Sequence, residues 1–169
     1  MIPLKNVEGI IEATEKLWFQ RRDFRLVFVG ELKREYYELV GFKNLLNSVI
    51  FFEGVVSYDA VAAKIQESDA MIIFSDTESQ SCVVLEALCC GKPCIVTNTG
   101  GVKELIDDEV NGYKVNVRDT ADLVDKMNRM INEYGSFDKE KISKMASELY
   151  SYETVGRQFA DCYKKAGHL

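Results

Sequence analysis

Short apolar runs alternate with helical patterns along most of the chain. A run of three to five apolar residues that ends in a glycine or a polar turn is typical of a buried parallel strand. The expected strands cover residues 26–29, 49–52, 70–74, 95–97 and 113–115. The expected helices cover residues 7–19, 33–46, 58–67 and 82–90, and three more lie between residues 120 and 166. Since right-handed crossovers leave few other topologies, this alternation predicts a parallel sheet with helices on both faces.

The composition is that of one soluble domain. A chain of 169 residues with 47% hydrophobic and 28% charged residues has enough apolar surface for a sizeable core. The net charge of −6 and the scattered Lys and Arg residues argue against a nucleic-acid-binding surface. No apolar run approaches the roughly 20 residues that span a bilayer. Lys5, Glu8 and Glu12 stand where a signal peptide would be apolar.

Five cysteines are present, an odd number that clusters mainly around residues 82–94. Because they lie in apolar surroundings, we expect them to be small core residues with free thiols, as in a reducing cytosol. No C-x2-C pair is present, and the single histidine is His168, next to the C-terminal residue. The sequence therefore predicts no metal site.

Two carboxylates mark the region where chemistry is expected. Glu78 lies in the polar turn after the strand at residues 70–74, and Glu86 lies inside the apolar helix that follows. Both can approach the carboxyl edge of a parallel sheet, where open α/β folds bind ligands. An unpaired charge is costly to bury, so Glu86 must find partners, face a cleft or lie on the helix surface. Glu78 could instead stabilise the N-terminus of the helix.

An ordered set of segments resembles a known family. Glu78 and Glu86 match the E-x7-E signature of retaining glycosyltransferases of family 4, and GKPCIVTNTGGVKELI looks like the next strand and Gly-Gly turn of that family. Four further segments resemble the family in order: residues 5–8, 25–30, 49–55 and 150–163. The resemblance covers nearly the whole chain. It implies a Rossmann-like parallel sheet flanked by helices, the C-terminal half of a GT-B fold, with residues 1–169 forming one donor-nucleotide domain and the N-terminal acceptor domain absent.

The resemblance also implies roles for single residues. Glu86 would accept hydrogen bonds from the ribose hydroxyls, Glu78 would hold donor-sugar hydroxyls, and Lys5 would neutralise the leaving diphosphate. The arginine that accompanies this lysine in the family would lie before Met1. Ser79, Gln80 and Ser81 replace a glycine-rich turn, so their backbone N–H groups would face the sugar or diphosphate, and Gln80 would add a side-chain contact.

Several backbone positions complete the expected site. Gly54, Val55 and Val56 would contact the base through backbone atoms, and Gly30, which closes the first strand, would also contact the donor. Gly100 and Gly101 would form a second close backbone approach. Ordinary turns explain these positions at least as well from the sequence alone.

The resulting hypothesis is a cytoplasmic glycosyltransferase that works in polysaccharide biosynthesis and uses a nucleotide-sugar as substrate, with neither metal nor cofactor. Its acceptor would be a glycan or a lipid-linked molecule. The missing domain would bind this acceptor and would also make any contact with the inner face of the membrane, so this chain alone would be inactive. Two alternatives stay open: a sugar-nucleotide epimerase of similar architecture, and a non-catalytic nucleotide-sugar-binding module. A Walker A loop is excluded because Pro93 follows Gly91-Lys92, and neither G-x-G-x-x-G nor D-x-D is present.

Overall fold

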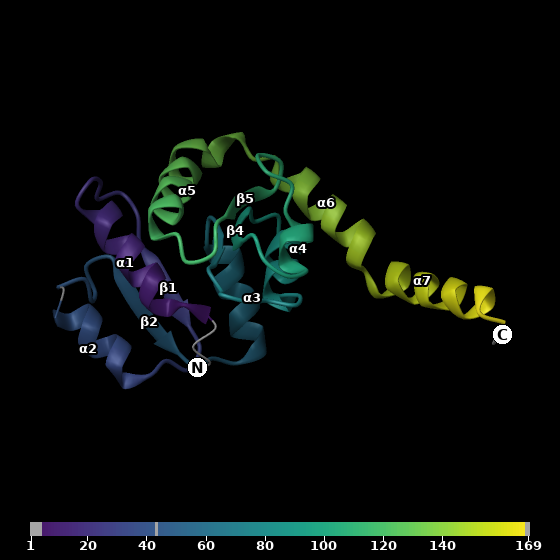
Figure 1. Cartoon of the computed structure of the whole chain (residues 1–169), viewed down its shortest axis with the longest axis horizontal. Helices are drawn as coiled ribbons and strands as arrows, with labels where there is room; N and C mark the ends of the chain where they lie inside the picture. The colour runs from purple at the N-terminus through teal and green to yellow at the C-terminus, as the bar shows by residue number, and fades with distance from the viewer. Residues whose placement is uncertain (1–4, 43, 168–169) are drawn as a thin grey trace.

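The computed structural model describes residues 5–42 and 44–167, and the expected alternation of strands and helices is confirmed (Figure 1). The strands are β1 Leu26–Val29, β2 Ile50–Gly54, β3 Met71–Ile73, β4 Cys94–Thr97 and β5 Gly112–Val115. The helices are α1 Val7–Trp18, α2 Arg34–Phe42, α3 Tyr58–Glu67, α4 Cys82–Cys89, α5 Thr120–Glu133, α6 Lys139–Tyr150 and α7 Tyr152–Lys165. Two 3-10 helices, η2 Val102–Leu105 and η3 Tyr134–Ser136, lie between them.

The strands pair in parallel, as predicted, but as two sheets. β1 pairs with β2, and β3, β4 and β5 form a second sheet in that order. Helix α1 joins the two halves, because Ile10, Ala13 and Leu17 pack into the core of the larger sheet while Val7 and Ile11 pack into that of the smaller one. Apolar contacts rather than a continuous hydrogen-bond ladder therefore hold the halves together.

The core centres on β4, whose four residues are all buried. Helix α5 packs against α1, and α6 packs against α4, so that helices cover the sheet on both sides (Figure 1). This layered arrangement places the carboxyl ends of β3 and β4 next to the N-terminus of α4.

Helix α7 extends away from the rest of the chain (Figure 1). It forms where the sequence predicts the closing helix, and none of its residues is buried. Tyr152, Phe159 and Tyr163 are all exposed along it. In the described part of the chain, no helix is long and apolar enough to cross a membrane.

The prediction that the cysteines are core residues is wrong for most of them. Cys94 on β4 is buried, and burial raises the pKa of its thiol, whereas Cys82, Cys89 and Cys162 are exposed. The reason on α4 is helical geometry, because Val84, Ala87 and Leu88 form the face that packs on the core. His168 lies outside the described residues, and residues 5–42 and 44–167 hold no His, Cys, Asp and Glu group suited to a metal ion.

Candidate functional site

The β3–α4 loop holds Glu78 in a protected position. Its side chain is only 13% exposed. The buried Ser75 hydroxyl donates a hydrogen bond to Glu78 Oε2 over 3.5 Å, and Lys5 Nζ forms an ion pair with the same oxygen. Lys5 and Glu78 are 73 positions apart, and the structure brings them together. Glu78 is thus a fixed, paired carboxylate rather than a solvated loop residue.

The start of helix α1 explains how Lys5 reaches this loop. Asn6 adopts a left-handed conformation with φ 45°, and its side chain accepts a hydrogen bond from the Gly9 N–H over 3.2 Å. Gly9 lies close to the Phe74 ring, since an added Cβ would come within 2.8 Å of it. Phe74 directly follows β3, so this contact seats the N-terminus of α1 beside the carboxyl end of that strand. Lys5, one residue before the cap, then lies over Glu78.

The Gly100-Gly101 turn packs directly on the acidic loop. The Gly101 N–H donates to the Ser79 carbonyl over 2.8 Å. Gly100 has φ 49°, and a Cβ on it would overlap the Glu78 carbonyl oxygen, while a Cβ on Gly101 would overlap the Ser79 carbonyl oxygen. The expected close backbone approach is therefore made to the protein's own loop. Contact of these glycines with a donor stays a prediction.

The three residues before α4 differ in access. Ser79 and Gln80 are exposed, whereas Ser81 is buried. Ser81 occupies the N-cap position, but its side chain makes no capping hydrogen bond. Ser79 and Gln80 can therefore contact a ligand at the N-terminus of α4, where backbone N–H groups favour an anion.

Glu86 lies half-buried on α4 and faces α3. The Tyr58 hydroxyl donates a hydrogen bond to Glu86 Oε1 over 3.4 Å. The charge of Glu86, and next this hydrogen bond, raise the pKa of Tyr58. The sequence offered no sign of Tyr58 beyond its place just after Ser57, the N-cap of α3.

The predicted base-binding positions begin at the end of β2, beside Gly30, the predicted donor contact that follows β1. The Gly30 N–H donates to the Gly54 carbonyl over 2.7 Å, and both glycines have positive φ, 120° and 68°. Val55 is 76% exposed and Val56 half-buried in the loop that leads to α3. The predicted residues thus fall into three groups: Lys5 and Glu78 with the glycine turn, Glu86 with Tyr58, which was not predicted, and Gly30 with Gly54.

An ion pair between Asp76 and Arg118 also belongs to this edge, and the sequence analysis missed it. Arg118 Nη2 lies 2.7 Å from Asp76 Oδ2, across 42 positions of the chain, and its hydrogen bond lowers the pKa of Asp76. Asp76 Oδ1 is buried and makes no hydrogen bond within the described residues. The pair ties the acidic loop to the segment after β5. No local pattern could have indicated it.

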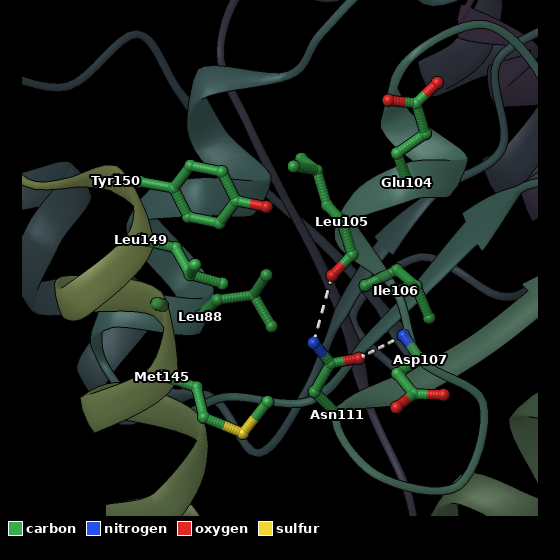
Figure 2. A pocket seen from close by; sticks show the side chains of 10 residues that line it. Leu88, Glu104, Leu105, Ile106, Asp107, Asn111, Met145, Leu149 and Tyr150 are labelled. Atoms are coloured by element: carbon green, nitrogen blue, oxygen red, sulfur yellow. Dashed lines mark hydrogen bonds between the residues drawn. The ribbon is translucent and has the colours of Figure 1, made fainter. Parts of the chain in front are cut away.

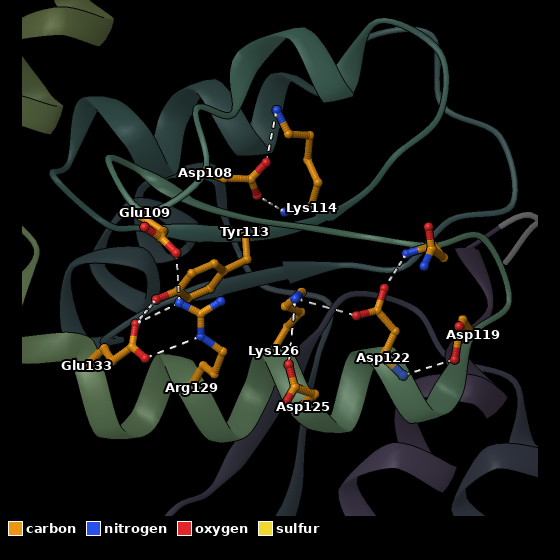
Figure 3. Close-up of polar contacts among 11 residues, drawn as sticks. Asp108, Glu109, Tyr113, Lys114, Asp119, Asp122, Asp125, Lys126, Arg129 and Glu133 are labelled. Carbon is orange, nitrogen blue, oxygen red and sulfur yellow. Dashed lines mark hydrogen bonds and ion pairs between the residues drawn. The ribbon is translucent and has the colours of Figure 1, made fainter.

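Two other prominent features lie outside this group. A cavity of about 250 Å³ separates α6 from residues 104–111, with Asn111 bridging the Leu105 carbonyl and the Asp107 N–H on one side (Figure 2). None of the predicted site residues lines it. On α5, Arg129 pairs with Glu109 and Glu133, and Glu133 accepts from the Tyr113 hydroxyl (Figure 3). Because these charges pair with one another, this network holds α5 on β5.

Solved structures of glycosyltransferases with the GT-B fold share this architecture. The structure of Anabaena HepE in complex with UDP and glucose matches with a TM-score of 0.84 over 98% of this chain and 46% of that one, at 20% identity. Staphylococcus aureus TarM matches with a TM-score of 0.82 over 95% of this chain and 33% of that one, also at 20% identity. These likenesses establish the fold.

Sequence comparison establishes the family. Residues 1–149 match the family described as glycosyl transferases group 1, and the chain belongs to this family of enzymes. An uncharacterized glycosyltransferase of Methanocaldococcus jannaschii is 27% identical over 96% of this chain, and N-acetyl-alpha-D-glucosaminyl L-malate synthase of Bacillus anthracis is 33% identical over 77% of it. The chain spans 42% of the first relative's length and 34% of the second's.

Proposed function

We propose that this chain is the donor-binding, C-terminal domain of a retaining glycosyltransferase of family 4. The observation that carries the proposal is the convergence of Lys5 and Glu78 beside the N-terminus of α4. A cation, a carboxylate and a helix N-terminus at one sheet edge suit a donor that carries both sugar hydroxyls and a diphosphate. The N-acetylglucosaminyl relative and the UDP complex of the Anabaena protein support a nucleotide-sugar as the donor class.

In the proposed reaction, the bond between the anomeric carbon of the sugar and the diphosphate oxygen breaks. An acceptor hydroxyl forms the new bond to that carbon on the same face and passes its proton to a group of the acceptor domain. Positive charge develops at the anomeric carbon and negative charge on the phosphates. Lys5 and the N–H groups at the start of α4 stabilise the phosphates, Glu78 holds sugar hydroxyls, and Glu86 holds the ribose. Catalysis is positional and electrostatic, and the chain itself supplies neither nucleophile nor general base for it. No metal or cofactor takes part.

The ion pair between Lys5 and Glu78 gives this mechanism a starting state. Lys5 is 43% exposed and Glu78 13% exposed on their side chains, so Lys5 is the partner that a ligand can reach. An arriving diphosphate competes with Glu78 for Lys5 and releases the carboxylate toward the sugar. Donor binding thereby makes Lys5 available to the diphosphate and Glu78 available to the sugar in one step.

An acceptor domain on the same polypeptide completes the proposal. The relatives devote more than half of their length to residues outside the matched region, which leaves room for a domain that binds a glycan or lipid-linked acceptor. We place the enzyme in cytoplasmic polysaccharide biosynthesis, with any contact to the inner membrane face made by that domain.

A two-stage assay tests the function. A thermal-shift screen of UDP, GDP, ADP and their sugar conjugates identifies the nucleotide, and we expect one nucleoside diphosphate to raise the melting temperature. The complete protein is then incubated with the labelled sugar conjugate. Transfer to an acceptor, with the anomeric configuration retained, supports the proposal. A new sugar isomer would instead support an epimerase, and binding without turnover a binding module.

Replacing Glu86 is expected to weaken nucleotide binding strongly. A hydrogen bond to a charged group contributes about 1.5–3 kcal/mol, so Glu86→Gln should raise the dissociation constant of the nucleoside diphosphate by about 10- to 150-fold. Calorimetry on the folded variant measures this dissociation constant. The matched control is Glu140→Gln on α6, an exposed carboxylate in the first turn of its helix. Equal affinities for the two variants would remove Glu86 from the site.

The 169-residue chain alone is expected to bind donor without transferring sugar. Without a second domain closed over the donor, its dissociation constant should be about 0.1–1 mM. The bound sugar is open to water, where electrostatic stabilisation is weak. Adding the N-terminal domain on the same polypeptide should tighten binding and create transfer, since domain closure expels water. Measurable transfer by the chain alone would contradict the assignment of the acceptor site to the N-terminal domain.

A further inference from the structure

Tyr58 stands where the predicted base loop meets helix α3. It is the first residue of α3, after Ser57, whose hydroxyl oxygen accepts a hydrogen bond from the Ala60 N–H over 3.3 Å. The Gly54–Val56 loop directly precedes this cap. The capped helix therefore fixes the backbone of Tyr58, while its side chain is free to meet a ligand because the residue is 76% exposed.

A cavity of about 220 Å³ lies beside Tyr58, between α3 and α4. Its lining comes from Tyr58, Val61, Ala62, Ile65, Glu86, Cys89 and Cys90. Glu86 is the only carboxylate in this lining, and the remaining residues are apolar apart from the tyrosine hydroxyl and two thiols. A ligand in this cavity meets apolar walls and a single acidic group, which is the arrangement that fixes the orientation of a bound small molecule.

The hydrogen bond between Tyr58 and Glu86 restricts the carboxylate without saturating it. An ionised carboxylate offers about four lone-pair positions. The Tyr58 hydroxyl takes one of them on Oε1, over a long distance of 3.4 Å. The other positions stay free to accept two hydroxyl groups on adjacent carbons. A side chain that is already oriented loses less conformational entropy when it binds a ligand.

We propose that Tyr58 is the positioning residue of the nucleoside subsite, where its hydroxyl orients the Glu86 carboxylate for the two ribose hydroxyls. The proposal rests on the proposed function, because it takes a nucleoside diphosphate as the ligand. It adds a residue that acts through Glu86 and sets the preference for ribose over deoxyribose. The ring of Tyr58 lines the side of the subsite next to the base loop.

The test compares ribose and deoxyribose ligands. UDP is the first probe, replaced by GDP or ADP if the screen favours one of them, and each is compared with its 2′-deoxy and 3′-deoxy forms by calorimetry. Tyr58→Phe keeps the ring and removes the hydroxyl. We expect it to weaken binding of the ribonucleotide by about 3- to 10-fold and binding of the deoxynucleotides by less than about 2-fold. The preference for ribose should shrink accordingly.

Two further variants separate positioning from a structural role. Tyr163→Phe removes an exposed hydroxyl from α7 and should leave both affinities unchanged. The double variant Tyr58→Phe with Glu86→Gln should bind no more weakly than Glu86→Gln alone, because Tyr58 acts through that carboxylate. Equal losses for ribose and deoxyribose ligands, or no loss, would overturn the role of Tyr58 and leave the proposed function intact. Failure of every nucleotide to bind the unmodified chain would instead overturn the proposed function itself, and this inference with it.

Discussion

Glu78→Gln is expected to lower the rate of glycosyl transfer by about 100- to 1,000-fold, the loss typical when one preorganised polar contact to the reacting group is removed. The contacts of Glu78 are proposed to be with the sugar ring, so the loss falls on the reaction. Affinity for the bare nucleoside diphosphate should stay the same or increase, because the substitution frees Lys5 from its ion pair. Steady-state kinetics on the complete protein and calorimetry with the diphosphate measure the two quantities.

The matched comparison for Glu78→Gln is a substitution that removes the positive charge of its ion-pair partner, Lys5. Lys5→Met removes the charge and keeps most of the side-chain length, so it should weaken binding of the diphosphate. Glu78→Gln, in contrast, should leave this binding unchanged or strengthen it. Glu140→Gln serves again as the control for loss of one negative charge. A Glu78→Gln variant that lost diphosphate affinity and transfer rate to the same extent would contradict the assignment of Glu78 to the sugar.

Gly100→Ala is expected to lower the free energy of unfolding by about 2–5 kcal/mol, of which about 1–2 kcal/mol comes from the left-handed backbone and about 1–3 kcal/mol from steric overlap. The backbone at Gly100 has φ 49°, and the added methyl group would overlap the carbonyl oxygen of Glu78. This oxygen belongs to the backbone, so, unlike the end of a flexible side chain, it can move away from the methyl group only if the loop moves. Urea denaturation measures the change.

The control for this substitution is Gly156→Ala on α7. A Cβ at Gly156 meets no atom within 4 Å, and the backbone there is helical. Alanine is the better helix former by about 1 kcal/mol, so this variant should be as stable as the parent chain or slightly more stable. If the two variants unfolded at the same urea concentration, the contact between the glycine turn and the acidic loop would be absent in solution.

Local sequence signals predicted most of the secondary structure. The helix at residues 58–67 formed with the predicted bounds, and α4 begins directly after Ser81. Such elements depend on nearby residues, because helical periodicity, caps and glycine ends act over a few positions. Family resemblance added the roles of Glu78 and Glu86, which stay predictions.

The second helix shows where local reasoning failed. The sequence predicted a helix over residues 33–46, but α2 ends at Phe42. Asn44 and Asn47 adopt positive φ, and Leu45 turns inward and is buried beside β2. Leu45, which the predicted helix included, is a core residue of the turn between α2 and β2. Tertiary burial therefore outweighed the helical pattern.

The sequence by itself determined the order and type of the elements, the parallel α/β class and the position of the acidic loop. Only the tertiary structure decided which side chains meet there: Lys5 with Glu78, Arg118 with Asp76, Tyr58 with Glu86, and the glycine turn with the loop backbone. The physical reason is the range of the forces involved. Helical hydrogen bonds and the burial patterns of helices and strands involve residues a few positions apart, whereas these contacts join segments 22 to 73 positions apart and exist only once the core has packed.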